Sequence, residues 1–202
     1  MLGKAAVAMW WDVAPAMQAG WEDWHTHEHM PERLRIPGFL RGSRWISRNS
    51  YFVLYELERA ATLTGAAYLK RLNNPTPWSR RMMPHHRNMV RSLCLVRASF
   101  GGGLSRALGT LRLSDAPPVK GLPGLSARKG LTAAHVLQAK RMARTPQTAE
   151  QKIRGGDAQM DWAVLISGHD APAVESTLRG LQNRLGGVAG FYSLSHSLSA
   201  GE

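Results

Sequence analysis

The apolar positions of the first hundred residues follow two different periods. In residues 51–57 the period is two, since Tyr51, Val53 and Tyr55 fall on one face of an extended chain and the intervening residues fall on the other. Shorter apolar runs predict three more strands around this one. The strands predicted in this half cover residues 6–11, 39–47, 51–57 and 93–100.

Between those runs the period lengthens to three and four residues. Met17, Trp21 and Trp24 recur at that spacing and predict a helix over residues 17–30, which a shorter turn extends to a Pro-Gly stop. Residues 60–72 predict a second helix. The resulting order of strand, helix, strand, strand, helix, strand is that of the ferredoxin-like βαββαβ unit.

The second hundred residues repeat this order with weaker definition. Residues 116–130 are rich in Pro and Gly, so a helix there would be short or irregular. Residues 144–157 are polar and predict a loop. The other predicted elements are strands over residues 104–113, 131–139, 162–168 and 191–198 and a helix over residues 171–185.

We therefore predict an α+β chain of two ferredoxin-like repeats, residues 1–100 and 101–202, joined at a run of three glycines. A single ferredoxin-like sheet carries helices on one face and leaves the other uncovered. Two such sheets can cover each other and close into an α/β barrel. This architecture predicts an enclosed pocket between the sheets, in which the first repeat carries the site and the second closes the barrel.

The composition is that of a globular protein and narrows its class. The 202 residues are 44% hydrophobic and 20% charged, and no apolar run reaches the roughly 20 residues of a membrane span. The single cysteine, Cys94, excludes an internal disulfide and a cysteine-based zinc site. Because the first residues make no convincing signal peptide, we expect a cytoplasmic protein without a membrane partner.

The net charge of +12 invites a nucleic-acid interpretation. However, the basic residues are shared almost equally between the halves, and no Lys/Arg run is longer than a pair such as Arg80-Arg81. There is neither a basic arm nor a recognition-helix pattern. We therefore expect no nucleic-acid partner and interpret the charge as an attraction for anionic small molecules.

The residues that build sites are distributed unequally, since six of the seven Trp and five of the eight His lie in the first hundred residues. Residues 24–34, followed by Ile36-Pro37-Gly38-Phe39, resemble a motif of the dimeric α/β-barrel superfamily. That motif has an aromatic pair, Glu-His, an apolar residue and Pro-Glu, then Pro-Gly-Phe entering the second strand. The EthD-like group is the most similar branch, and the tandem order resembles fused members in which one chain builds its own barrel.

The resemblance implies a fold and a range of chemistries. Relatives include cofactor-free monooxygenases, muconolactone isomerases, polyketide cyclases and haem-binding enzymes. By position His29 matches the motif histidine and Glu28 its acidic neighbour, whereas His25 stands where many relatives have Tyr. Fused halves are compatible with a monomeric barrel, and the outer barrel surfaces leave a homodimer open.

The three motif residues also spell H-x-x-E-H, a zinc-peptidase pattern. Catalytic zinc needs a third protein ligand, and no downstream Glu on a second helix stands out to supply one. We therefore expect no metal and assign His29 to proton transfer, oriented by Glu28 or His25. The alternative is that His29 only caps the helix end or bonds a carbonyl group near Pro31.

The remaining candidates would line a pocket. Aromatic side chains suit a flat ligand, although core packing explains them as well, and guanidinium groups can hold an anion. The candidates are Trp10, Trp24, Trp45 and Tyr55 for the flat part of the ligand and Arg33, Arg41 and Arg44 for its anionic group. His86, in a segment rich in His and Arg, is a cofactor ligand only if the protein binds haem.

The sequence thus favours a small-molecule enzyme that needs no cofactor. Its expected chemistry is of the isomerase, cyclase or cofactor-free oxygenase type, with acid/base catalysis on a flat apolar or aromatic compound that carries a negative charge. A haem-binding barrel protein and a non-catalytic small-ligand binding protein are the two alternatives.

Overall fold

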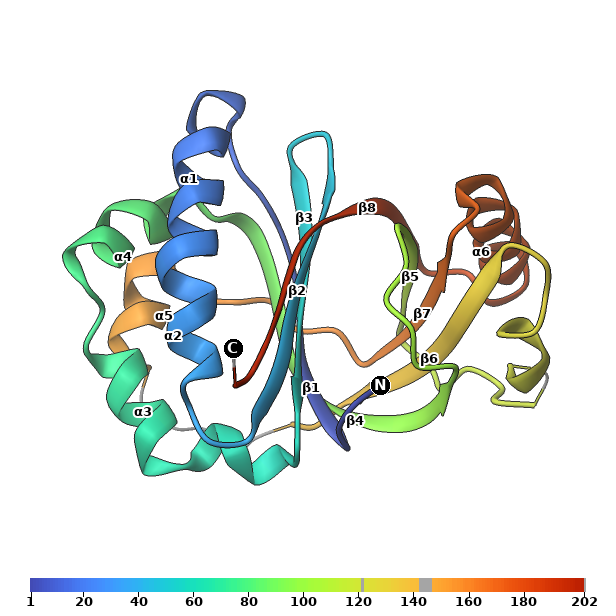
Figure 1. Cartoon of the computed structure of the whole chain (residues 1–202), viewed down its shortest axis with the longest axis horizontal. Coiled ribbons are helices and arrows are strands. Elements are labelled where there is room, and N and C mark those ends of the chain that lie inside the picture. Colours follow the sequence, from blue (N-terminus) through green and yellow to red (C-terminus); the bar gives the residue numbers. More distant parts are fainter. Residues whose placement is uncertain (121, 142–146, 202) are drawn as a thin grey trace.

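Eight antiparallel strands close into one barrel in a computed structural model of the protein (Figure 1). The model describes residues 1–120, 122–141 and 147–201. Around the barrel the strands follow the order β1, β3, β2, β8, β5, β7, β6, β4. Their bounds are Ala5–Asp12 (β1), Phe39–Ser47 (β2), Ser50–Leu57 (β3), Arg87–Phe100 (β4), Ala107–Leu113 (β5), Leu131–Ala139 (β6), Trp162–Gly168 (β7) and Val188–Ser199 (β8).

Each half of the chain supplies four neighbouring strands of this barrel. The first half gives β4, β1, β3 and β2, and the second gives β8, β5, β7 and β6, which is the same ferredoxin-like order read from its own first strand. The halves join where β2 pairs with β8 and where β4 pairs with β6. The predicted tandem ferredoxin-like α/β barrel is therefore confirmed, whereas the division between residues 100 and 101 stays a prediction.

The outer face of the first sheet carries most of the helical turns, and that of the second sheet carries one long helix (Figure 1). On the first sheet lie α1 (Gln18–Trp24), η2 (His25–His29), α2 (Met30–Leu34), η3 (Ala60–Thr64), α3 (Ala66–Asn73), α4 (Pro77–Met82) and η4 (Met83–His85). The second sheet carries α6 (Ala171–Leu185), with the short turn η5 (Pro123–Leu125) beside β6. No helix in the described ranges is both long and apolar enough to span a membrane.

Two segments near the motif helix differ most from their prediction, and the predicted helix 60–72 is divided into η3 and α3. Strand β4 starts at Arg87 rather than at residue 93, because its polar first residues pair with β1. Within the predicted loop 144–157 the chain forms a helix, α5 (Ala149–Arg154), and residues 144–146 lie outside the described ranges. Helix α5 is stabilised by a capping box, in which the Thr148 hydroxyl accepts from the Gln151 backbone N–H and the Gln151 side chain accepts from the Thr148 backbone N–H.

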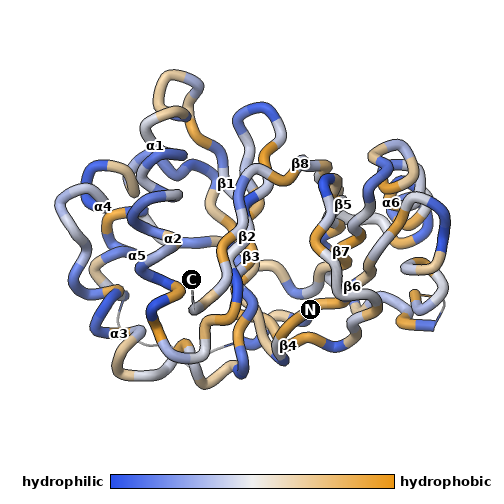
Figure 2. Tube along the Cα trace, in the orientation of Figure 1, coloured by the Kyte–Doolittle hydropathy of each residue, from blue (hydrophilic) through white to orange (hydrophobic). Residues whose placement is uncertain are grey.

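The core has three parts, because both faces of each sheet are buried. One part lies between the first sheet and its helices, the second between the other sheet and α6, and the third inside the barrel. In Figure 2 apolar segments follow the strands, while hydrophilic segments mark much of the helical layer on the first sheet. Inside the barrel Phe52 lies with its ring centroid 4.8 Å from that of Trp10 and 5.6 Å from that of Trp45.

The filled interior corrects the predicted location of the pocket. Side chains of both sheets occupy the space between them, and a cavity of only about 30 Å³ beside Trp45 and Leu108 is found there. Large aromatic residues on three neighbouring strands meet where the sheets face each other. Among the described residues, the barrel interior thus offers no substrate-sized space.

Candidate functional site

The motif residues lie on one helical segment that changes its hydrogen-bond pattern midway. Helix α1 passes into a π-helical turn, η2, which covers His25–His29, and continues as α2. The backbone N–H of Met30 reaches five residues back to the carbonyl of His25. Pro31 has no N–H to donate and its ring crowds the preceding turn, which accounts for a widened turn at this place. Single π turns of this kind are frequent at functional sites.

The widened turn places His29 over the outer face of the first sheet. Its ring lies 4.5 Å from that of Trp24, measured between centroids, and 5.6 Å from that of His25. The Nδ1 atom of His29 is buried and has no partner. Burial, with the positive charge of Arg33 added, lowers the pKa of His29 well below 6.5, so the imidazole is neutral at pH 7.

His25 faces a different neighbour. Its Nδ1 atom lies 3.4 Å from Nη1 of Arg44, which can only donate, and its ring stacks on Trp21 at a centroid distance of 4.8 Å. Burial, followed by the charge of Arg44, lowers the pKa of His25 well below 6.5. His25 is thus engaged by Trp21 and Arg44.

Glu28 points away from His29 and toward α4. Its Oε1 accepts from the indole N–H of Trp24 at 3.1 Å and from the hydroxyl groups of Thr76 and Ser79 at 2.5 and 3.2 Å. Thr76 is also the N-cap of α4. Among the described residues no hydrogen bond joins Glu28 to His29, so this carboxylate ties the motif helix to α4.

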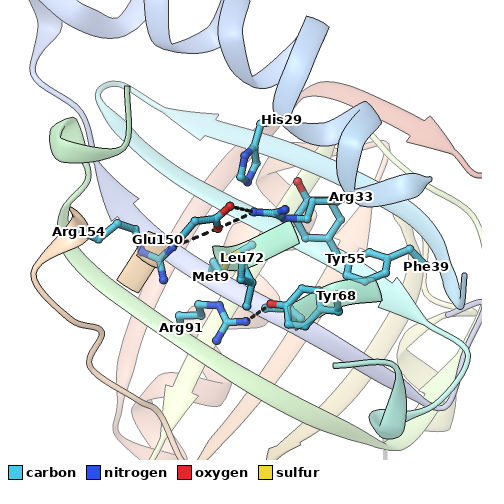
Figure 3. A pocket seen from close by; sticks show the side chains of 11 residues that line it. Met9, His29, Arg33, Phe39, Tyr55, Tyr68, Leu72, Arg91, Glu150 and Arg154 are labelled. Atoms are coloured by element: carbon cyan, nitrogen blue, oxygen red, sulfur yellow. Dashed lines mark hydrogen bonds and ion pairs between the residues drawn. The ribbon is translucent and has the colours of Figure 1, made fainter. Parts of the chain in front are cut away.

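Below His29 lies a cavity of about 40 Å³ between the helices and the outer face of the first sheet (Figure 3). All four strands of that sheet reach it, and so do three helical segments from both halves of the chain. The lining residues are Val7, Met9, His29, Arg33, Phe39, Tyr55, Tyr68, Leu72, Arg91, Glu150 and Arg154.

A buried network of ions forms one wall of this cavity (Figure 3). Arg33 donates through Nη2 to both carboxylate oxygens of Glu150 at 2.5 Å. Arg154 lies 3.8 Å from Glu150 and is held by Asp157 through hydrogen bonds of 2.8 and 3.1 Å. Arg91 donates to the hydroxyl of Tyr68 at 2.6 Å. Three guanidinium groups thus face two carboxylates, which leaves an excess of one positive charge.

Tyr55 forms another part of the wall, and its hydroxyl group is buried without a partner. Burial raises the pKa of this phenol, so it stays protonated and can donate. The ring fits because β2 has a glycine beside it: a Cβ atom at Gly42 would lie 2.8 Å from Tyr55 Cε1 and 3.0 Å from Met30 Cγ.

The cavity therefore collects three unpartnered polar atoms, namely His29 Nδ1, Arg33 Nη1 and Tyr55 OH. Four other such atoms occur among the described residues, on Trp11, Trp21, Trp45 and His196, and none of those residues lines this cavity. A buried polar atom without a protein partner is costly unless water or a ligand satisfies it. The arrangement is suited to a ligand that has a negative oxygen near Arg33 and Tyr55.

The other predicted pocket residues lie elsewhere. Trp10 and Trp45 point into the barrel, on the opposite face of the sheet from His29. Arg41 pairs with the buried Glu56 at 2.5 Å, and Arg44 donates to the backbone carbonyl of Glu22. The structure thus brings together His29, Arg33 and Tyr55 from the predicted set, with Trp24 packed against His29.

His86 is the residue that the sequence predicts as a ligand if the protein binds haem. The partly buried ring of His86 is packed against Trp11 and Trp21, and its Nδ1–H donates to the carbonyl of Met83 at 2.8 Å. His86 does not line the cavity below His29, and 40 Å³ accommodates only a few water molecules at roughly 10–15 Å³ each. The cavity below His29 does not fit haem in this arrangement.

The cavity also contains residues that the sequence reasoning missed. Glu150 and Arg154 come from the segment predicted as a loop, and Arg91 lies in the part of β4 that was not predicted as a strand. The capping-box pattern of Thr148 and Gln151 was a signal for a helix there. Among the described residues, no three His, Cys, Asp or Glu side chains form a group that could hold a metal ion.

No protein-family model matches the sequence, and no curated protein does so either. Solved structures do match it along its length. An anthrone oxidase-like protein shares 11% identity with a TM-score of 0.63, covering 98% of this chain and 94% of its own. A monooxygenase candidate from Fusobacterium nucleatum shares 7% identity with a TM-score of 0.55, covering 98% of this chain and 96% of its own.

A monooxygenase candidate from Lactobacillus acidophilus shares 6% identity with a TM-score of 0.55, covering 98% of this chain and 97% of its own. At such identities the likeness shows the fold alone. That fold agrees with the predicted ferredoxin-like α/β barrel, whereas membership of the superfamily and of its EthD-like branch stays a prediction.

Proposed function

We propose that this chain is a small-molecule enzyme in which His29 takes a proton from a flat aromatic substrate whose negative group is held by Arg33. The convergence of His29 Nδ1, Arg33 Nη1 and Tyr55 OH on one cavity carries this proposal. A bound oxyanion would give acceptors to Arg33 and Tyr55, and its neighbouring C–H or O–H would lie beside the imidazole.

The electrostatics of the site support a base whose pKa rises when an anionic substrate binds. In the free protein His29 is neutral, because burial and Arg33 oppose its protonation. A negative ligand beside the ring favours the imidazolium, so its binding raises the pKa of His29 toward the working pH. The proton acceptor therefore becomes stronger only when an anionic substrate occupies the cavity.

The surrounding residues have positioning roles in this proposal. Trp24 packs against the His29 ring and donates to Glu28, which anchors the motif helix to α4. Tyr55 donates to charge that develops on the substrate oxygen. Removal of a proton from an electron-rich aromatic compound leads to tautomerisation, to ring closure or to reaction with dioxygen. The last outcome is compatible with the names of two of the structural neighbours.

The proposal is tested with the full chain and a panel of polycyclic hydroxyaromatic acids. We expect His29→Asn to lower kcat for any substrate found by about 100-fold or more, the usual contribution of a general base. His27→Asn is the matched control, since His27 lies on the same turn but its side chain is 68% exposed. We expect that control to stay within about two-fold of the wild type.

Two results would contradict the proposal. Full turnover in His29→Asn would remove the proton-transfer role. Tight binding of panel compounds with no conversion over long incubation would make the protein a binding module instead.

A further inference from the structure

Helix α5 covers the cavity of the first repeat although it belongs to the second half of the chain. In Figure 1 it lies beside α2 and α4, across the barrel from α6. In the first repeat the link between the second and third strands is the two-residue turn 48–49. The corresponding link between β6 and β7 runs over residues 140–161 and carries α5 to the other repeat. The second repeat therefore contributes directly to the site of the first.

The residue that α5 buries fully is a carboxylate. Glu150 is 1% exposed, and it is the one fully buried residue of this helix. Both of its oxygens contact Arg33, and one lies 3.8 Å from Arg154. A surface helix ordinarily docks through apolar side chains. On α5 the apolar side chain of Ile153 is only partly buried, so the ion pair between Glu150 and Arg33 is the central contact of this helix.

The positive groups around Glu150 outnumber the negative ones. Arg33, Arg91 and Arg154 all line the cavity, and the acidic groups near them are Glu150 and Asp157. Asp157 is already engaged by both hydrogen bonds of Arg154. Without Glu150 the cavity would present guanidinium groups, a phenol and an imidazole with a single carboxylate at its margin. Such a donor set recognises a carboxylate by paired hydrogen bonds.

The size of the cavity adds a second constraint. A volume of about 40 Å³ accommodates water but not an aromatic acid, so a ligand must displace part of the wall. The strands are fixed by the hydrogen bonds between them. Helix α5, in contrast, is followed by Gly155 and Gly156, which have a left-handed backbone and no neighbouring atom within 4 Å of where a Cβ would lie. Helix α5 has only six residues and is held against the cavity by an ionic contact at its centre.

We propose that Glu150 is an internal stand-in for the substrate's carboxylate, and that an aromatic carboxylic acid displaces Glu150 together with α5 to bind Arg33 and Tyr55, which lie on α2 and β3. This inference rests on the proposed function for the identity of the site, and it names the substrate class as a carboxylate. No covalent step is involved, because one carboxylate replaces another at the Arg33 guanidinium.

The first test measures binding by calorimetry at pH 7, with 2-naphthoate as the probe and the uncharged 2-naphthamide as its match. We expect Glu150→Gln to bind 2-naphthoate at least ten-fold more tightly than the wild type, because the internal competitor has lost its charge. Glu175→Gln, on the exposed Glu175–Arg179 pair of α6, is the control and should bind like the wild type. The inference is overturned if Glu150→Gln gains no affinity, or if it binds the amide as tightly as the acid.

The second test needs no variant and covers the case in which Glu150→Gln fails to fold. Hydrogen exchange of residues 147–158 is followed in the wild type with and without saturating 2-naphthoate. We expect exchange in that segment to become at least ten-fold faster with the ligand, while α6 is unchanged. Unchanged or slower exchange in the segment overturns the displacement. Because both tests measure binding, they are independent of whether His29→Asn loses turnover.

Discussion

A partly buried histidine below the motif helix makes the folding stability of this protein depend on pH. His86 packs edge-on against both Trp11 and Trp21, with ring centroids 5.1 and 5.5 Å away, and its Nδ1–H donates to the carbonyl of Met83. Burial lowers its pKa to about 3, against the partial compensation of that backbone hydrogen bond. The folded protein therefore keeps His86 neutral, while the unfolded chain takes up a proton below about pH 6.5.

The difference between the pKa values of His86 in the folded and unfolded states determines how the folding stability changes with pH. Proton uptake by the unfolded state alone means that stability is complete above pH 6.5 and falls as the pH falls from 6.5 toward 3. Between pH 7 and pH 5 the loss of unfolding free energy from His86 is about 2 kcal/mol. His25 and His29 act in the same direction, because burial lowers both of their pKa values well below 6.5.

The assay is urea unfolding of the wild type and of His86→Asn at pH 7, 6 and 5. The asparagine amide can take the place of Nδ1 and donate to Met83, but it does not titrate. We expect the variant to lose about 2 kcal/mol less unfolding free energy than the wild type between pH 7 and 5. His27→Asn, at an exposed site, should follow the wild type. Parallel curves for His86→Asn and the wild type would refute a neutral, buried His86.

Three further predictions concern the packing around the site. Phe52→Ala, at a fully buried position inside the barrel, should lower the unfolding free energy by roughly 3–5 kcal/mol in urea, and a loss below about 1 kcal/mol would contradict a filled interior. Arg33→Met should cost roughly 3–5 kcal/mol because it leaves the Glu150 carboxylate buried alone, whereas Arg33→Met with Glu150→Met should recover most of that loss in a double-mutant cycle. Thr148→Ala should weaken the cap of α5 by about 1 kcal/mol, seen as faster hydrogen exchange in residues 149–154 but not in α6.

The sequence alone determined the elements whose pattern is local. Strand β3 matches its predicted range to within one residue, because the alternation over 51–57 can be satisfied only by an extended chain. The motif helix and the long helix α6 were predicted for the same reason, from their spacing of three and four residues. Their order was enough to predict the ferredoxin-like units and the barrel that they close.

The tertiary structure decided which face of each strand meets the helices. Both faces of β3 are apolar, with Tyr51 and Tyr55 on one and Phe52 and Leu54 on the other, so alternation cannot say which face closes the barrel. The answer depends on packing against the other sheet. In the structure Tyr55 lies on the face that the helices cover, beside the cavity, and Phe52 lies on the face inside the filled barrel.

Long-range packing also explains why all of the ionic wall except Arg33 was missed. Glu150 reaches Arg33 across 117 residues of chain, and the polar sequence around it resembles any solvated loop. A hydrophobic pattern indicates only which side chains prefer water. It cannot predict that a carboxylate is buried against a guanidinium group. Local periodicity thus determined the scaffold, while long-range charge pairing, which only the closed barrel makes possible, determined what the scaffold encloses.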